Sequence, residues 1–406
     1  MSLRKRINLI TAILFSTALP PASHAADSAD AIRKYQQSLI DDEITGSNVV
    51  MIYRDGKRVY HEAVQSGRTG DRDIDANTLF PVWSMTKPIT TVAMMILHEQ
   101  GKFDWNDEVS RYIPCMANLT WRDSDEIKPC TKPLRIIHLM THRSGWDYDV
   151  RPGYETVYSP NIAFDSIYPI QTRYDDLQSY VEACAKHPLA FEPGSRYLYG
   201  INQAIQGRIV EVITGMPFEA YLRKVIFEPL GMKDTGFSMT AEQRSQFQPL
   251  WFNAGHLKGY THLLDELSYS PKSRAHFGDG GLVCTLEDYA RFCEMLTDGG
   301  LFRGKRIISQ KSIDTMTAKW SEGFPEEPDS FPPIPGYING FSLFVLDDSS
   351  HHEPTVPKGI YGWVGYHNTH FWIDTKNRQF GLFMSRAREF NWQIGVGLRK
   401  VVYGQK

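Results

Sequence analysis

Ser84-Met85-Thr86-Lys87, followed directly by Pro88-Ile89-Thr90, is the stretch that decides how this chain is interpreted. A serine and a lysine three positions apart at the start of a helix lie on one helix face, within side-chain reach of each other. A buried lysine with a lowered pKa can take the proton of a serine hydroxyl and make that serine a nucleophile. The stretch therefore predicts a nucleophilic Ser84 with Lys87 as its partner.

The residues that follow predict a helix that starts at this Ser-Lys pair. Apolar residues recur there at helical spacing, and Gly101 supplies the stop signal. The apolar positions are Ile89, Val92, Ala93, Ile96 and Leu97. Ser84 then lies at the N-terminal end of a helix with a core-facing stripe, where the helix dipole favours a developing negative charge.

The N-terminus has the features of a secretory signal peptide. A basic segment (residues 4–6) precedes a mostly apolar run (7–19), and Ser23-His24-Ala25 is a small-x-small cleavage site. We expect residues 1–25 to be removed by cleavage after Ala25 and the protein to be periplasmic or secreted. The apolar run is too short for a transmembrane helix, and no cysteine lies near the cleavage site, so no stable membrane anchor is expected.

Length and charge narrow the class of protein. The chain has 406 residues, of which 42% are hydrophobic, and a formal net charge of −3. This is enough to bury a large core in one domain spanning residues 26–406. Loss of the leader removes only positive charges, which makes the mature chain more acidic and argues against nucleic acid as a partner. The sequence makes no prediction of the oligomeric state.

The five cysteines suggest one disulfide. Cys115 and Cys130 flank a polar, loop-like stretch, and an exported protein permits a bridge between them. The alternative is five free thiols packed as small apolar residues. No Cys-x-x-Cys pair and no His-Glu-x-x-His motif is present, so no metal and no cofactor are expected.

Strand-like segments near both chain ends, with helices between them, predict an α+β fold. Strands are predicted at 49–53, 58–62, 341–346, 369–373 and 379–384, and helices at 31–41, 205–213, 218–227, 286–296 and 391–403. This order predicts an antiparallel sheet built from both chain ends and flanked by helices. Residues 26–110 and 280–406 would form the sheet-containing part, and residues 111–279 a mostly helical inserted subdomain.

Several further motifs, in this order and spacing, make the chain resemble the serine β-lactamase and penicillin-binding-protein superfamily, in its class C-like esterase branch. Besides Ser84-Met85-Thr86-Lys87, they are Leu139-Met140-Thr141-His142-Arg143-Ser144-Gly145, Phe191-Glu192-Pro193-Gly194-Ser195-Arg196-Tyr197-Leu198-Tyr199, Pro229-Leu230-Gly231-Met232, Gly280-Gly281-Leu282 and Gly362-Trp363-Val364-Gly365. The resemblance covers most of the mature chain and implies a β-lactamase/transpeptidase-like fold.

The resemblance implies a role for each site residue. Ser84 would form the acyl-enzyme, Lys87 would help to deprotonate it, and Tyr199 would share the role of general base. The backbone N–H groups of Ser84 and Tyr366 would form the oxyanion hole. Taken alone, Tyr199 could equally be an aromatic residue packed beneath the turn at Pro193-Gly194. Because the chain also carries the Ser84 motif, we favour the catalytic interpretation of Tyr199.

Two departures from the family pattern narrow the chemistry. The lactamase branch carries Tyr-x-Asn where this chain has Tyr199-Gly200-Ile201, so Asn202 comes one residue late. That branch also carries Lys-Thr-Gly on its third-motif strand, where this chain has Trp363-Val364-Gly365. The missing lysine would pair with a substrate carboxylate, so Trp363 and Gly365 indicate a substrate-binding surface suited to neutral, apolar groups.

The histidines and the aromatic loop leave alternatives open. His367 is predicted to orient substrate or tune Tyr199, or else to be a half-exposed strand histidine. His142 is interpreted as structural, and residues 351–353 as solvated surface. Aromatic residues between positions 145 and 193 line a pocket for an apolar ester or pack within a long loop; they are Trp146, Tyr148, Tyr154, Tyr158, Phe164, Tyr168 and Tyr174.

These patterns together predict an exported serine hydrolase that cleaves small carboxylic esters through a Ser84 acyl-enzyme. A second hypothesis is a D-amino-acid peptidase, an amidase or a weak β-lactamase, which would act on small-molecule amides. A third is a non-catalytic homologue that binds cell-wall peptides or partners. The joint presence of Ser84, Lys87 and Tyr199 argues against the third, because binding alone has no chemical need for all three.

Overall fold

The computed structural model describes residues 22–146, 148, 174–253, 258–261, 269, 271–320, 335–350 and 352–404, with side chains from residue 28 onward. The leader before residue 22 and the aromatic residues Tyr154, Tyr158, Phe164 and Tyr168 lie outside the described residues. Predictions made for them stay predictions.

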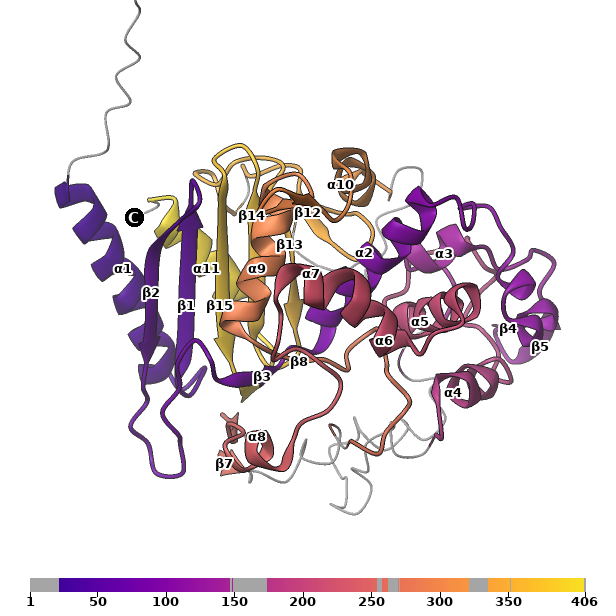
Figure 1. Cartoon of the computed structure of the whole chain (residues 1–406), viewed down its shortest axis with the longest axis horizontal. Helices are drawn as coiled ribbons and strands as arrows, with labels where there is room; N and C mark the ends of the chain where they lie inside the picture. The colour runs from indigo at the N-terminus through magenta and orange to yellow at the C-terminus, as the bar shows by residue number, and fades with distance from the viewer. Residues whose placement is uncertain are drawn as a thin grey trace, which may run out of the picture.

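A seven-stranded antiparallel sheet is built from both ends of the chain (Figure 1), in the order β11-β12-β13-β14-β15-β1-β2. Within it, β1 (Asn48–Arg54) from the N-terminal part pairs with β15 (Gln379–Ser385) from the C-terminal part. The other strands are β2 (Lys57–Val64), β11 (Tyr337–Asn339), β12 (Phe344–Leu346), β13 (Tyr361–Gly365) and β14 (Thr369–Asp374). This confirms the predicted fold class.

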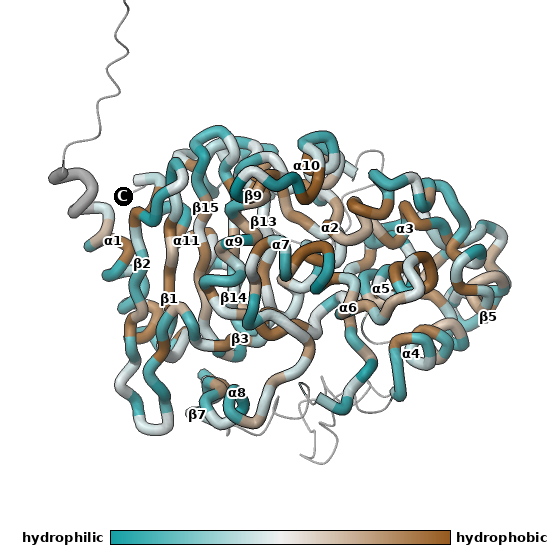
Figure 2. Tube along the Cα trace, in the orientation of Figure 1, coloured by the Kyte–Doolittle hydropathy of each residue, from teal (hydrophilic) through white to brown (hydrophobic). Residues whose placement is uncertain are grey.

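Helices cover both faces of the sheet. Successive side chains of a strand point to opposite faces, and in β1 the side chains on both faces are apolar. Val49 and Met51 of β1 belong to the main core, whereas Val50 and Ile52 pack in a second cluster. The main core includes residues of α2 (Thr86–Glu99) and α9 (Leu286–Thr297); the second cluster includes residues of α1 (Ala22–Asp41) and α11 (Gln393–Val402). Figure 2 shows hydrophobic residues running along β1 between these layers.

A helical region lies beside the sheet, and α2 connects the two (Figure 1). Its central helix α5 (Asn202–Thr214) contacts α2, α3 (Ile136–Met140), α4 (Leu177–Cys184) and α6 (Phe218–Leu222). The remaining elements are β3 (Leu79–Pro81), η1 (Trp83–Met85), η2 (Val109–Arg111), η3 (Pro114–Asn118), β4 (Thr120–Asp123), β5 (Glu126–Pro129), η6 (Arg223–Phe227), α7 (Glu228–Leu230), α8 (Ala241–Ser245), β6 (Leu250–Phe252), β7 (Gly259–Thr261), β8 (Val283–Thr285), β9 (Leu301–Phe302), β10 (Lys305–Arg306), α10 (Gln310–Thr317) and β16 (Ala387–Arg388). Among the described residues, no helix is both long and apolar enough to cross a membrane.

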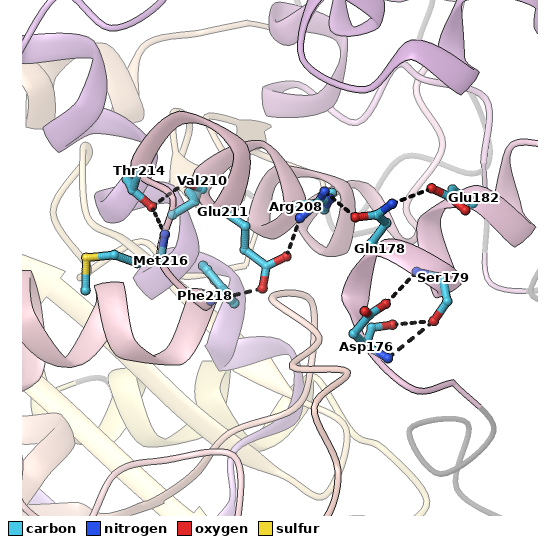
Figure 3. Close-up of polar contacts among 10 residues, drawn as sticks. All are labelled: Asp176, Gln178, Ser179, Glu182, Arg208, Val210, Glu211, Thr214, Met216 and Phe218. Atoms are coloured by element: carbon cyan, nitrogen blue, oxygen red, sulfur yellow. Dashed lines mark hydrogen bonds and ion pairs between the residues drawn. The ribbon is translucent and has the colours of Figure 1, made fainter.

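Side-chain contacts hold α5 against its neighbours (Figure 3). Arg208 donates hydrogen bonds to Glu211 on its own helix (3.1 Å) and to Gln178 of α4 (2.6 Å). Glu211 also accepts a hydrogen bond from the backbone N–H of Phe218, the first residue of α6 (3.1 Å). Because α5 begins shortly after Tyr199, these contacts help to fix the segment that carries this tyrosine.

The predicted bridge between Cys115 and Cys130 is wrong, since both are free thiols. The stretch between the two is not an open loop, because it contains the rest of η3 and the β4–β5 hairpin. Cys115 lies near Glu182 of α4, whereas Cys130 lies near Glu192 and packs against the main core. The two thiols therefore face different neighbours. Burial raises the pKa of Cys130 to about 11, which keeps it protonated at neutral pH.

The interpretation of residues 351–353 as solvated surface is also wrong for Glu353. Its side chain is fully buried and accepts a hydrogen bond from Arg399 Nε of α11 (2.7 Å). Arg399 Nη2 also donates to the Tyr337 hydroxyl (2.6 Å). The local sequence is polar, but α11 packs over the sheet and brings a buried cation to this loop. His352 is exposed, and His351 lies outside the described residues.

His370 of β14 makes stability depend on pH. Its side chain is 1% exposed, and neither ring nitrogen has a hydrogen-bond partner in the described part of the chain. Burial, with a smaller contribution from the Arg399 charge, lowers its pKa to about 3. The unfolded chain binds this proton near pH 6.5, so stability falls as the pH drops from about 6.5 towards 3. Lowering the pH from 7 to 5 should cost about 2 kcal/mol of unfolding free energy at this residue.

Urea unfolding at pH 7 and pH 5 checks this expectation. Wild type contains other histidines with lowered pKa, such as His138 (about 4), so the informative quantity is the difference from the variant His370→Phe. The phenyl ring keeps the contacts with Phe383 and Phe390 but cannot take a proton. The variant should lose about 2 kcal/mol less than wild type between the two pH values. Equal losses would contradict the assignment.

Candidate active site

Ser84 lies in η1, the short turn that leads into α2. The turn is held by two backbone hydrogen bonds: Val82 N–H donates to the Leu282 carbonyl (3.0 Å), and Met85 N–H donates to the Val82 carbonyl (2.9 Å). Trp83 has φ of 45°, a left-handed conformation that residues other than glycine seldom adopt. This turn places the half-buried Ser84 side chain at the N-terminal end of α2, as the sequence predicted.

Lys87 is buried on the first turn of α2 and its ammonium group is fully satisfied. Nζ donates hydrogen bonds to Ser84 Oγ (3.2 Å), to the Tyr148 hydroxyl (2.6 Å) and to the Asp279 backbone carbonyl (2.5 Å). An ammonium group has three hydrogens, and three acceptors match them. Nζ also lies 4.6 Å from the centre of the Tyr199 ring, close enough for a cation–π contact.

Tyr199 approaches Ser84 from the segment that precedes α5. Its hydroxyl donates to Ser84 Oγ over 2.6 Å. Burial raises its pKa well above the usual value, and hydrogen bonds with Ser84, Tyr148 and Trp363 partly offset this rise. The resting side chain is therefore a phenol whose proton points at Ser84. Ser84 Oγ thus lies within hydrogen-bonding distance of two groups able to exchange a proton with it, one on α2 and one in the segment before α5.

The end of β13 lies next to η1 because Gly365 has no side chain. A Cβ atom at this position would lie 2.3 Å from the Val82 carbonyl oxygen, which is too close for any other residue. Thr369 Oγ1 donates to the same carbonyl from the facing strand (3.4 Å). Gly365 therefore allows the β13–β14 turn, which contains Tyr366, to approach the residue before Trp83. The Trp83 and Tyr366 rings are in edge contact, with centroids 5.8 Å apart.

Trp363 is fully buried in the middle of β13, and its ring centre lies 5.9 Å from that of Tyr199. Trp363 therefore lies in the same site as Ser84 and Lys87, with its ring packed against Tyr199. His367 differs from its alternative prediction as a half-exposed strand histidine. It is 1% exposed, lies in the turn after β13 and contacts the Trp83 ring (4.9 Å between centroids). The structure thus brings Ser84, Lys87, Tyr199 and the third-motif turn together.

Two contributions to the site were not predicted, and the question left open for Asn202 is answered. Tyr148, assigned only to an aromatic stretch, accepts a hydrogen bond from Lys87. The Asp279 carbonyl does the same from the residue before Gly280-Gly281-Leu282, a motif that served only to mark the family resemblance. Asn202 does not reach Ser84: its amide Nδ2 lies 3.0 Å from His142 Nδ1. These contacts join segments far apart in sequence, so no local pattern signals them.

Among the described residues, no group of three or more histidine, cysteine, aspartate or glutamate side chains could hold a metal ion. The chemistry that the arrangement supports is proton transfer from Ser84 to a neighbouring base, followed by attack on a carbonyl carbon.

Known proteins are similar to this chain in sequence and in fold. The family model described as Beta-lactamase matches residues 31–396. Esterase EstB of Burkholderia gladioli is 30% identical over 234 residues, which cover 56% of this chain and 57% of that protein. A putative D-alanyl-D-alanine carboxypeptidase of Salmonella schwarzengrund is 30% identical over 266 residues, covering 61% and 57%.

A solved structure of EstCE1, described as a hydrolase with promiscuous acyltransferase activity, has the same fold. It superposes with a TM-score of 0.74 at 20% identity, covering 94% of this chain and all of that one. The family match spans nearly the whole described fold, from α1 to α11, and includes the segments that carry Ser84, Lys87 and Tyr199. The chain therefore belongs to the Beta-lactamase family of serine hydrolases.

Proposed function

We propose that this hydrolase cleaves neutral carboxylic esters through an acyl-enzyme on Ser84. The observation that carries the proposal is the position of Ser84 Oγ, within 3.2 Å of Lys87 Nζ and 2.6 Å of the Tyr199 hydroxyl, beside a third-motif strand that carries Trp363 in place of a cation. The two contacts of Ser84 Oγ provide a nucleophile, and Trp363 selects against a substrate with a charged acid group.

The reaction would begin with transfer of the Ser84 proton to the Tyr199–Lys87 pair. In the reactive form Tyr199 has released its own proton to bulk water, and the nearby Lys87 ammonium favours the resulting phenolate because it lies against the ring face. The phenolate oxygen then takes the Ser84 proton. Ser84 Oγ then attacks the ester carbonyl carbon. The backbone N–H groups of Ser84 and Tyr366 would hold the resulting oxyanion.

The pair then returns the proton to the leaving alcohol as the C–O bond breaks. Water attacks the Ser84 ester in the second half of the cycle, with Tyr199 and Lys87 again taking its proton. The products are a carboxylic acid and the free enzyme. Tyr148 and the Asp279 carbonyl would keep Lys87 in place throughout, since both accept hydrogen bonds from its ammonium group.

The alternative is a D-amino-acid peptidase, an amidase or a weak β-lactamase. Its support is the similarity to putative D-alanyl-D-alanine carboxypeptidases, whose name implies a substrate that ends in a carboxylate. In this chain, Trp363 is buried at the position where the lactamase pattern has a lysine. A substrate carboxylate would therefore lose a cationic partner here, which is why we favour esters.

Relative rates on two substrates test this choice. A charged hydrogen-bonded pair contributes ~1.5–3 kcal/mol, and 1.4 kcal/mol corresponds to about tenfold in rate. We therefore expect kcat/KM for p-nitrophenyl butyrate to exceed that for nitrocefin, which carries a carboxylate, by at least about tenfold. Trp363→Lys should move this ratio towards nitrocefin, even if total activity falls.

The matched control is Trp363→Phe, which keeps an aromatic side chain and adds no charge. The ratio of the two kcat/KM values should therefore still favour p-nitrophenyl butyrate. A wild-type protein that prefers nitrocefin would replace the esterase proposal with the lactamase or peptidase alternative. Equal ratios in the lysine and phenylalanine variants would show that position 363 does not select the substrate charge.

We propose that the protein is exported, on the evidence of the basic segment, apolar run and cleavage site in its leader. N-terminal sequencing of the protein purified from a periplasmic or culture fraction tests this. The expected first residue is Ala26, and an intact Met1 in the exported fraction would contradict cleavage.

A further inference from the structure

His142 is a buried titratable residue next to the site that the reaction above does not use. It follows α3 in the motif Thr141-His142-Arg143-Ser144-Gly145 and is 1% exposed. Its backbone has φ of 54°, in the left-handed region. Its carbonyl accepts a hydrogen bond from the Leu198 N–H (2.8 Å), so the backbone of this turn is joined to the residue directly before Tyr199.

The imidazole ring packs against the aromatic ring of Tyr199. The two centroids are 5.1 Å apart with 34° between the planes, and the Tyr197 ring lies at 5.7 Å. Tyr199 also contacts the rings of Trp363 and Tyr148, at centroid distances of 5.9 and 5.5 Å, while its hydroxyl points at Ser84. The ring position of Tyr199 therefore depends on His142 from one side.

Hydrogen bonds fix the His142 ring in turn. Nδ1 lies 3.0 Å from Asn202 Nδ2, at the start of α5, and Nε2 lies 3.2 Å from Ser342 Oγ, next to β12. Gln203 Nε2 donates to the same serine oxygen. Gln203 Nε2 also lies 3.3 Å from His142 Nε2, so amide groups face both ring nitrogens, and the neutral ring accepts a hydrogen bond at one of them. These contacts tie the ring to α5 and to the sheet at once.

The electrostatic surroundings keep this ring uncharged. Burial and the charge of nearby Lys87 both hold the pKa of His142 well below its usual range. The other groups that face the ring are Tyr197, Tyr199, Asn202, Gln203 and Ser342, none of which is anionic at neutral pH. A neutral imidazole adds no second cation beside Lys87, whose ammonium group lies 4.6 Å from the centre of the Tyr199 ring.

We propose that His142 is a positioning residue for the reaction: its neutral ring holds Tyr199 at hydrogen-bonding distance from Ser84 and takes no proton itself. This inference rests on the proposed function, because it assigns Tyr199 a part in activating Ser84. It accounts for Asn202, which binds His142 and so acts on Tyr199 indirectly, in place of the direct site contact that the Tyr-x-Asn pattern provides.

The variant that tests this is His142→Asn. Asparagine tolerates the left-handed backbone and offers a side-chain oxygen to Asn202, but it has no ring to pack against Tyr199. The readout is the second-order rate of Ser84 labelling by a fluorophosphonate probe, together with kcat and KM for p-nitrophenyl butyrate. Labelling and kcat should both fall about tenfold with KM unchanged, because nucleophile activation is lost and binding is not.

The matched control is His138→Asn, four residues earlier on α3. His138 is also partly buried and uncharged at neutral pH, and its Nδ1 accepts the Arg135 N–H (3.2 Å), but it makes no contact with Tyr199, Lys87 or Ser84 among the contacts described for it. It should label at the wild-type rate. A comparable fall in both variants would mean that lost stability, and not lost positioning, slows the reaction, and would overturn the proposal.

A measurement on wild type covers the case in which His142→Asn fails to fold. In protein labelled with ¹⁵N-histidine, His142 should keep one protonated and one unprotonated ring nitrogen from pH 5.5 to 9, while kcat/KM changes over that range. An imidazole signal that titrates together with the rate would show that His142 is itself the base. Failure of the proposed function is distinguishable, since wild type would then either fail to label at Ser84 or prefer nitrocefin to p-nitrophenyl butyrate.

Discussion

Replacing Lys87 by methionine should lower kcat/KM for p-nitrophenyl butyrate by about three orders of magnitude. General acid–base groups contribute typically 10²–10⁴-fold, and this lysine lies beside both the nucleophile and the tyrosine that would share its proton. Methionine matches the length of the buried side chain and removes the charge. The melting temperature should stay close to that of wild type, because the variant no longer buries a cation, which offsets the lost hydrogen bonds.

Stopped-flow or steady-state kinetics check the expected loss of kcat/KM, and a thermal melt checks the melting temperature. Lys102→Met is the matched control, since Lys102 is exposed just beyond α2 and the substitution is the same. It should retain wild-type kcat/KM. If Lys87→Met keeps more than about a tenth of the wild-type activity, Lys87 is not part of the general base. A loss that small is below the range expected for a proton-transfer group.

Removing the Tyr199 hydroxyl should also depress the rate strongly, by about a hundredfold or more for both p-nitrophenyl butyrate and nitrocefin. Tyr199→Phe keeps the ring contacts with His142 and Trp363 and deletes only the group 2.6 Å from Ser84 Oγ. Because the proton transfer is common to all substrates, the ratio of the two rates should stay the same. A specificity contact would instead change the ratio.

Tyr197→Phe is the matched control for that experiment. Tyr197 is buried two residues earlier, and its hydroxyl makes no hydrogen bond within the described part of the protein. This variant should keep wild-type rates on both substrates. If Tyr199→Phe also left both rates unchanged, the mechanism would be wrong although the fold and the family would stand.

The Ser84–Lys87 pair could be predicted because the two residues are close together in the sequence. Ser84 and Lys87 share one helical turn, so their proximity follows from helix geometry alone. The sheet was predictable because strand patterns occur near both chain ends, and strands at the ends of an α+β chain commonly pair. The position of Tyr199 came from the family resemblance; its 2.6 Å contact with Ser84 depends on how α5 and the turn at His142 pack.

The errors have a common physical cause. A polar local sequence predicted solvent exposure for Glu353 and an open loop between Cys115 and Cys130, but burial depends on distant segments. Arg399 of α11 buries Glu353, and the β4–β5 hairpin occupies the presumed loop. Tyr148 and the Asp279 carbonyl were missed as partners of Lys87 for the same reason, since three separate segments converge on one ammonium group.

The most direct test of the central claim is active-site labelling with a fluorophosphonate probe, followed by intact mass and peptide mapping. The account predicts one adduct per chain, located on Ser84, and none in Ser84→Ala. An adduct on another residue, or labelling that persists in Ser84→Ala, would contradict the assignment of Ser84 as the nucleophile.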